Sequence, residues 1–236
     1  MADSSVIDLL RGIELFSGLQ DEQLEELSAF MTVKDFFEGE TIIREGDDSQ
    51  QALFLVASGA VKVFMTGSDG RETILSLLGR GDFFGEMSII DGGVRSASVK
   101  AISETKLLLL PRDHFLDLLQ TTPELSQAML LEMARRLRKA NRQIGALSTM
   151  SVSGRVLATL RSLIEERGVR LHSKGGVPVT VIRNRPTQQQ LAEMSGTTRE
   201  TVSRVISGLS KKKAVSIEGK DLFIMDENSL NKGSED

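Results

Sequence analysis

The pattern of apolar residues in this 236-residue chain changes at Pro111, and the change limits the folds that the chain can adopt. Before Pro111, short runs rich in Val, Ile, Phe and Leu are separated by Gly, Asp and Ser, a pattern typical of a small all-β unit. After it the periodicity becomes helical, as it also is over 21–31. The expected strands are Thr41–Ile43, Ala52–Val56, Val61–Met65, Thr73–Leu78, Ala97–Ala101 and Lys106–Leu110.

A long helix is expected to begin at Pro123, because no further Gly or Pro occurs before Gly145. Its apolar residues are spaced alternately three and four apart, as in a heptad seam. A helix that packs on its own domain would fit as well over so few turns. The polar remainder leaves a narrow stripe, which favours self-association and predicts a homodimer. The stripe consists of Leu130, Met133, Leu137, Ala140, Ile144 and Leu147.

Composition and charge restrict the functions open to the chain. The absence of Cys excludes disulfides, thiolate metal sites and iron–sulfur clusters. No leader peptide and no apolar run long enough for a membrane span is found, so we expect a cytoplasmic protein without a membrane partner. Residues 1–110 hold 9 basic and 19 acidic residues, whereas residues 151–236 hold 14 and 10. A basic last third on an acidic protein fits a sensor joined to a nucleic-acid module.

The stretch from Gly81 to Val99 contains one carboxylate and one guanidinium nine residues apart, Glu86 and Arg95. Arg95 offers a planar fork of donors that suits phosphate oxygens. Gly85 permits close backbone approach and a positive φ. Glu86 would repel phosphate, so we expect it to accept a hydrogen bond from a hydroxyl, such as a ribose 2′-OH. For an isolated match, a β-turn with a surface Glu–Arg ion pair would explain these residues equally well.

Residues 186–209 contain two helix starts separated by Ser195 and Gly196, the pattern of a helix-turn-helix. Capping boxes are expected at Thr187 with Gln190 and at Thr197 with Glu200. The apolar residues expected to pack the two helices together are Leu191, Met194, Val202, Val205, Ile206 and Leu209.

The second of these helices presents a mixed polar arc made of Thr198, Arg199, Glu200, Ser203 and Arg204. Arg reads guanine and Glu accepts from cytosine, so the mixture indicates base readout in double-stranded DNA. The alternative is an exposed face with a Glu200–Arg204 pair inside the helix.

Further elements are expected around this motif. A helix is predicted over 152–167, and Val177–Ile182 is predicted to form an edge hairpin. The lysines at 211–213 precede a β-hairpin wing, where Lys212 would meet phosphate. The tail over 228–236 is polar and is expected to be disordered.

With both motifs in view, the chain from about residue 10 to 226 resembles the CRP/FNR family of bacterial transcription regulators. The resemblance implies an α+β fold with three parts and a tail. The parts are a jelly-roll-like β-roll that binds a cyclic nucleotide (1–111), a linking and dimerisation helix (112–151) and a winged helix-turn-helix (152–227), followed by the tail (228–236). It also implies an allosteric regulator that is not an enzyme. His114 and His172, the two histidines, lack an arranged nucleophile or acid.

The resemblance further implies a ligand, partners and site residues. The ligand would be cyclic AMP, with cyclic GMP possible and no metal, and RNA polymerase would be a partner. Ala140 and Asn141 stand where cyclic-AMP-binding members have two hydroxyl residues, so cyclic di-GMP or a constitutive regulator stays open. Arg199, Glu200 and Arg204 would read a half-site similar to TGTGA, with Thr187 also at the DNA. The ligand would contact Gly85, Glu86, Met87, Arg95, Ser96, Ala97, Ala140 and Asn141.

Overall fold

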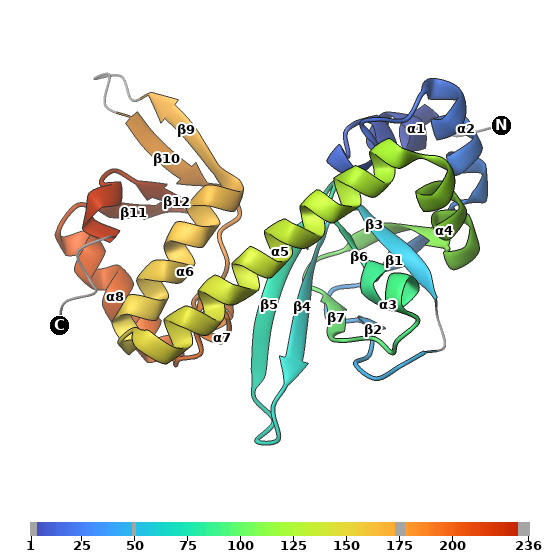
Figure 1. Ribbon diagram of the computed structural model, residues 1–236. Coiled ribbons are helices and arrows are strands. Elements are labelled where there is room, and N and C mark those ends of the chain that lie inside the picture. The colour runs from blue at the N-terminus through green and yellow to red at the C-terminus, as the bar shows by residue number, and fades with distance from the viewer. Residues whose placement is uncertain (1–3, 49–50, 173–177, 231–236) are drawn as a thin grey trace. The chain divides into compact units, whose positions relative to one another are not determined.

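The computed structural model describes residues 4–48, 51–172 and 178–230. The chain divides into two compact units, Met1–Arg138 and Lys139–Asp236. The division falls inside the long helix α5 (Pro123–Thr149), which therefore contributes residues to both units. Pro123 is the first helical residue of α5, as the sequence predicts (Figure 1).

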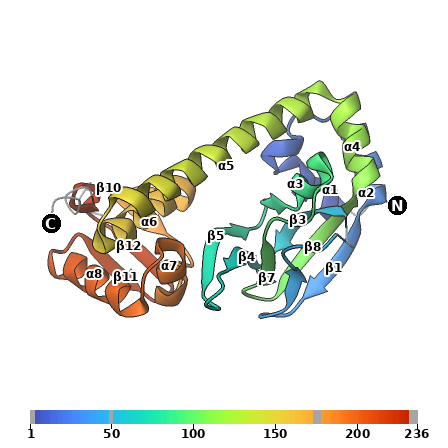
Figure 2. The same ribbon diagram turned by 60° about the horizontal axis from the view of Figure 1, so that its bottom comes forward.

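The described part of the first unit holds eight strands in two antiparallel sheets of four (Figure 2). The expected β-roll is confirmed, and five of the six predicted runs lie within its strands; the sixth, Ala97–Ala101, begins one residue before β7. Two short strands, β1 and β6, were not predicted. One sheet has the order β1 (Thr32–Phe36), β8 (Thr105–Pro111), β3 (Ala52–Ser58), β6 (Phe83–Phe84). The other has the order β2 (Thr41–Ile43), β7 (Ser98–Ala101), β4 (Ala60–Thr66), β5 (Glu72–Gly79).

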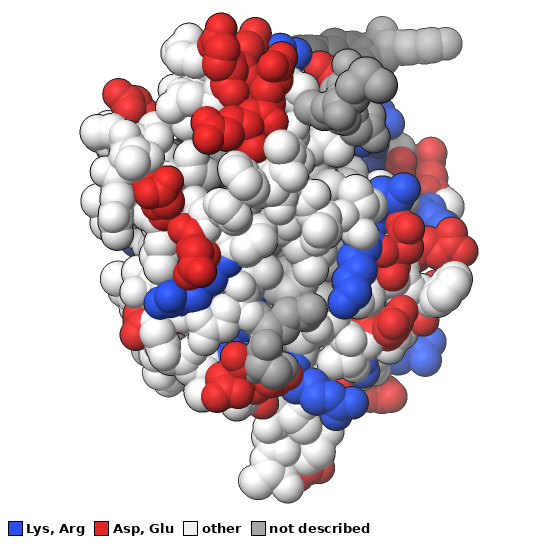
Figure 3. Space-filling model, turned by 90° about the vertical axis from the view of Figure 1, so that its right-hand side faces the viewer, with Lys and Arg blue, Asp and Glu red and all other residues white. Residues whose placement is uncertain are grey.

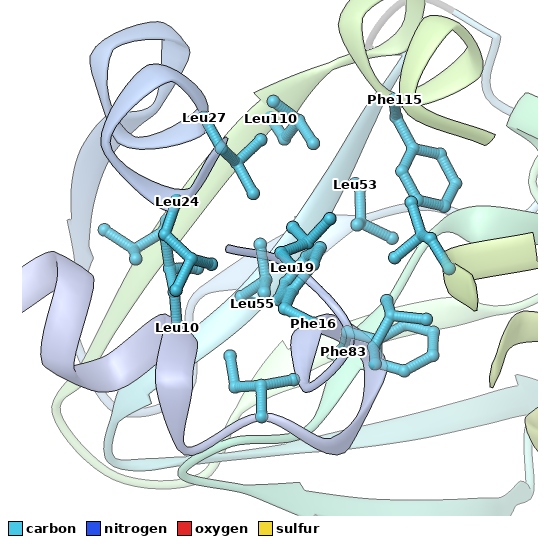
Figure 4. Close-up of a cluster of buried hydrophobic side chains, with 14 of the residues drawn as sticks. Leu10, Phe16, Leu19, Leu24, Leu27, Leu53, Leu55, Phe83, Leu110 and Phe115 are labelled. Atoms are coloured by element: carbon cyan, nitrogen blue, oxygen red, sulfur yellow. The ribbon is translucent and has the colours of Figure 1, made fainter. Parts of the chain in front are cut away.

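Strand β3 is buried on both faces because a core lies on each side of it. Leu53 and Leu55 point into a core shared with the helices, whereas Phe54 and Val56 point into the core between the sheets. Successive side chains of a strand alternate between its faces, so two cores require a continuous apolar run. Figure 4 shows the helix-side core, in which each buried Leu contributes roughly 1.5–3 kcal/mol. Its helices include α1 (Ser4–Arg11), η1 (Glu14–Phe16), α2 (Asp21–Phe30) and α4 (Arg112–Thr121), and α5 adds Leu125 and Met129.

The second unit is a winged helix-turn-helix built on one four-stranded antiparallel sheet. The predicted helix pair packs through its apolar faces onto α6, with Leu160, Leu191 and Ile206 in one buried core. The helices are α6 (Val152–Arg167), α7 (Gln188–Ser195) and α8 (Arg199–Lys211). The sheet has the order β11 (Val215–Glu218), β12 (Asp221–Ile224), β10 (Pro178–Ile182), β9 (Gly168–His172).

Two expectations for this unit need correction. Strand β10 pairs antiparallel with the edge strand β9, as an edge hairpin requires, but β10 itself is internal because it also pairs with β12; Val177 of the predicted strand lies outside the described residues. The predicted disordered tail begins too early: Glu227–Leu230 forms the 3-10 helix η2, and Leu230 is fully buried. Arg161 Nη1 donates to the carbonyl of Leu230 at 2.6 Å, which anchors the segment. Residues 231–236 lie outside the described residues.

The two units differ in charge in the way that the sequence predicts. Figure 3 shows a face of the first unit on which Asp and Glu side chains gather into an acidic patch at the top of the view. Among the residues that the structure describes, no helix is both long enough and apolar enough to cross a membrane.

Candidate ligand cradle and nucleic-acid interface

Gly85 lies at the centre of the candidate ligand cradle, which we define as residues 85–87 and 95–97. It has φ +87° and lies between β6 and helix α3 (Glu86–Asp91), for which it is the N-cap. A Cβ atom at this position would lie 2.7 Å from Nη1 of Arg95 and 3.0 Å from the carbonyl oxygen of Ala52. The position therefore requires glycine twice, for its backbone conformation and for the close approach of the guanidinium.

Arg95 is buried in the cradle, with 5% of its surface exposed. Its Nη1 donates to the carbonyl of Gly85 at 2.7 Å and its Nη2 to that of Ala52 at 3.2 Å, above the ring of Phe54. Burial lowers the pKa of the guanidinium, while the charges of Glu86 and Asp47 raise it. Since arginine stays protonated in proteins, the cradle holds a desolvated cation. A bound anion would offset this desolvation.

Glu86 is the buried carboxylate of the cradle, and only one of its oxygens is satisfied. Oε1 accepts a 3.0 Å bond from Nη1 of Arg136, whose Nη2 donates to the carbonyl of Phe83 at 2.9 Å. Oε2 is buried and has no hydrogen-bond partner among the described residues. A buried acceptor without a partner is costly and uncommon, so Oε2 is a place where a hydroxyl donor of a ligand would be stabilised.

Arg136 contacts the cradle but was not predicted to do so. In the sequence it is only one of several polar residues beside the apolar seam of the long helix. Its guanidinium lies 4.7 Å from the centroid of Phe83, and its Nε donates to Glu132 at 2.8 Å. The spacing of Glu132 and Arg136, four residues apart on a helix, was a visible signal of an ordered guanidinium. Its long-range partner Glu86 is 50 positions earlier in the chain and could not be read from spacing.

The remaining predicted ligand residues differ in their placement. Ser96 is exposed, and its Oγ lies 3.7 Å from the Sδ of Met87, so these two side chains adjoin at the rim of the cradle. Ala97 is buried beside them. Ala140 and Asn141 belong to the second unit, where Asn141 is exposed. Their assignment to the ligand stays a prediction.

The first helix of the helix-turn-helix begins as predicted and the second does not. Thr187 caps α7 through a capping box with Gln190. The cap of α8 is Thr198, one residue later than expected, and its side chain accepts from the N–H of Thr201. The N–H of Thr197 donates to the carbonyl of Ala192 at 3.0 Å, so it is not available to the side chain of Glu200, and the predicted capping box at these two residues does not form.

The predicted DNA-reading residues form an exposed surface at the start of α8: Thr198, Arg199, Glu200, Ser203 and Arg204. No ion pair joins Glu200 to Arg204 in the described part of the chain, so the pairing within the helix is absent. The backbone N–H of Glu200 and the hydroxyl of Thr198 lower the pKa of Glu200. Lys212 is exposed at the C-terminal end of α8. Contact of these side chains with DNA stays a prediction.

Comparison with known proteins matches each unit to a described domain family. Residues 33–122 match the family described as "Cyclic nucleotide-binding domain", and residues 154–232 match the "Crp-like helix-turn-helix domain". A CRP-like cAMP-activated global transcriptional regulator from Mycobacterium tuberculosis is 31% identical over 223 residues, which cover 94% of this chain and 97% of the relative. This chain belongs to the CRP/FNR family. It combines a cyclic nucleotide-binding domain with a Crp-like helix-turn-helix, and the relative from Mycobacterium tuberculosis is named a transcriptional regulator.

A curated sequence and a solved structure from Thermus thermophilus extend the comparison within the family. The one named cyclic AMP receptor protein is 37% identical over 206 residues, which are 87% of this chain and 89% of the relative. The solved structure of the catabolite activator protein is 33% identical, with a TM-score of 0.52 over 94% of this chain and 98% of that chain.

Proposed function

We propose that this protein is a dimeric transcription regulator that responds to cyclic AMP and binds a palindromic DNA site. The observation that carries the proposal is the buried, unpaired Oε2 of Glu86 beside the buried guanidinium of Arg95. A cyclic nucleotide supplies a ribose hydroxyl that can donate to Oε2 and a phosphate anion that can offset the buried charge of Arg95.

The cradle would bind the ligand by an exchange of partners. Phosphate oxygens would take the donors of Arg95 that now face the carbonyls of Gly85 and Ala52. Bonds from the guanidinium to an anion add the attraction of opposite charges, which neutral carbonyls do not supply, so the exchange favours binding. Glu86 would accept the ribose hydroxyl on Oε2, while Arg136 keeps the carboxylate in place through Oε1.

The identity of the base is the least constrained part of the proposal. Relatives from Mycobacterium tuberculosis and Thermus thermophilus carry cyclic AMP in their names, which supports this nucleotide. Asn141 has both a donor and an acceptor and is compatible with either purine. Cyclic GMP, cyclic di-GMP and a regulator that needs no ligand are therefore outcomes of the test.

Titration calorimetry with cyclic AMP, cyclic GMP and cyclic di-GMP tests the ligand. Arg95→Gln should weaken binding by at least tenfold, because it removes the charged donors. Arg80→Gln is the matched control, since Arg80 is an exposed arginine of the same unit. Binding of none of the three nucleotides by the wild-type protein would refute the sensor. Preference for cyclic GMP or cyclic di-GMP would refute cyclic AMP as the ligand but not the sensor.

The seam on α5 supports the dimer. Leu130, Leu137 and Ile144 follow each other at intervals of seven residues, and each is more than 60% exposed. Large apolar side chains in such a row are costly in water and favour a second copy of the helix. Leu137→Asp should yield a monomer in sedimentation velocity. Leu131→Asp is the control, because Leu131 is also exposed but lies off the seam.

In the dimer, bound nucleotide would shift a two-state equilibrium that sets two copies of α8 about one DNA turn apart. Glu200→Ala should relax base preference, whereas Lys212→Ala should weaken binding to all sequences alike. Equal losses on specific and random duplexes for Glu200→Ala would refute base readout at this residue. RNA polymerase is the partner that we expect for the DNA-bound dimer.

A further inference from the structure

Arg155, on the first turn of α6, contacts the turn of the helix-turn-helix from outside the motif. Its Nε donates to the carbonyl of Ser195 at 2.9 Å, and its Nη2 donates to the carbonyl of Gly196, also at 2.9 Å. These two carbonyls lie at the C-terminal end of α7, where backbone acceptors have no partner within the helix. A cation at this end also interacts favourably with the helix dipole.

A second contact from the same face of α6 holds the same turn. Thr159 lies one helical turn after Arg155, and its Oγ1 is 3.0 Å from the Oγ of Ser195. The Ser195 hydroxyl is buried and donates to the carbonyl of Leu191 at 2.6 Å. The turn is thus joined to α6 through both its backbone and its side chain.

The held turn adjoins the residues proposed to read DNA. Only Thr197 separates Gly196 from Thr198, the cap of α8, and Arg199 and Glu200 follow directly. A displacement of the turn would therefore move these side chains relative to the base edges. Base readout requires side chains to be placed within about 0.5 Å.

We propose that Arg155 is a positioning residue for DNA specificity: it fixes the start of α8 through the two carbonyls without contacting DNA. The inference rests on the proposed base readout by α8. A guanidinium is suited to this role because its planar fork meets two carbonyls at once, which the point charge of a lysine does not do.

Arg161 provides a matched control on the same helix. It also donates to a backbone carbonyl, that of Leu230, but this contact anchors the C-terminal segment and not the turn. Arg155→Gln and Arg161→Gln each remove one positive charge and the guanidinium bonds to backbone. Arg155→Lys keeps the charge and removes the fork.

The experiment measures affinity for two duplexes by fluorescence anisotropy, with saturating cyclic AMP, over a range of salt concentrations. One duplex is the site that the wild-type protein selects from a randomised pool, and the other is random. Thermal unfolding of each variant gives the folded fraction, by which the affinities are corrected.

Arg155→Gln should lower the ratio of specific to random affinity by about tenfold, with Arg155→Lys in between and Arg161→Gln unchanged. The salt dependence should stay that of the wild type, because Arg155 faces carbonyls. A phosphate contact would instead weaken both duplexes equally and reduce the salt slope by about 1, which would overturn the inference. An unchanged ratio, or an equal fall for Arg161→Gln, would also overturn it. If the wild-type protein selects no sequence, the proposed base readout itself fails.

Discussion

Arg95 in the ligand cradle is 5% exposed and donates to two backbone carbonyls, whereas Arg199 and Arg204 at the start of α8 are exposed to solvent. The cradle is a small buried polar site, in which each charged group depends on its neighbours to offset desolvation. The polar side chains at the start of α8 are solvated, so they do not depend on one another to offset desolvation. We therefore expect substitutions in the cradle to affect both stability and binding, and those on α8 to affect mainly binding.

Gly85→Ala should give the largest effect, because its Cβ would displace the guanidinium of Arg95. We expect nucleotide affinity to fall by about 2–4 kcal/mol, as for a buried charged bond left unmade. Gly70→Ala is the control: Gly70 also has a positive φ, but a Cβ there would meet nothing within 4 Å. Equal affinities for the two variants in calorimetry would show that the close approach at Gly85 does not matter.

Arg136→Gln should have the next largest effect, since it leaves the buried Glu86 carboxylate with one donor fewer. Arg136 is one-third exposed, so we discount the full cost of breaking a buried pair to about 1–2 kcal/mol of unfolding free energy. Arg135→Gln, which removes a bidentate but exposed pair with Glu14, should cost less than Arg136→Gln. Urea unfolding of both variants compares them, and equal losses would contradict a special role for Arg136.

Gly196→Ala tests whether the turn before α8 requires glycine only for its backbone conformation. Gly196 has φ +59°, and an added Cβ would lie 3.1 Å from Cδ2 of Leu147, the end of a flexible side chain. We expect a loss of about 1 kcal/mol of unfolding free energy in urea, from the left-handed conformation. Nucleotide affinity should not change. A fall in nucleotide affinity as large as that expected for Gly85→Ala would remove the contrast between the two regions.

The smallest expected effect is on how stability depends on pH through Glu200. The pKa of its carboxyl is lowered, so the folded protein binds a proton there less readily than the unfolded chain does. The stabilisation is therefore present above the unfolded pKa and is lost as the pH falls through the lower, folded pKa. Thermal unfolding of wild type and Glu200→Gln should differ slightly near neutral pH and converge in acid. A difference that grows toward acid would have the wrong sign.

The sequence predicted most elements because local rules decide them. The apolar runs of β3 and β8 follow from burial on two faces, and the start of α5 follows from Pro123. The errors arose where long-range contacts decide. Strand β10 is internal because β12 pairs with it, and η2 is ordered because Arg161 and the core hold Leu230. The capping box predicted at Thr197 does not form because the N–H of Thr197 is used by α7, and Thr198 caps α8 instead.

The sequence by itself determined the residue types of both sites: a carboxylate and a guanidinium around a glycine, and a mixed polar arc on a helix that follows a turn. These types can be read because local backbone geometry and helical periodicity act over a few residues. Only the tertiary structure decided that Arg136 holds Glu86 from 50 positions away, that the other oxygen of Glu86 is left without a partner, and that Arg155 holds the turn before α8. Hydrogen bonds between distant segments form when the chain packs, and no spacing in the sequence encodes them.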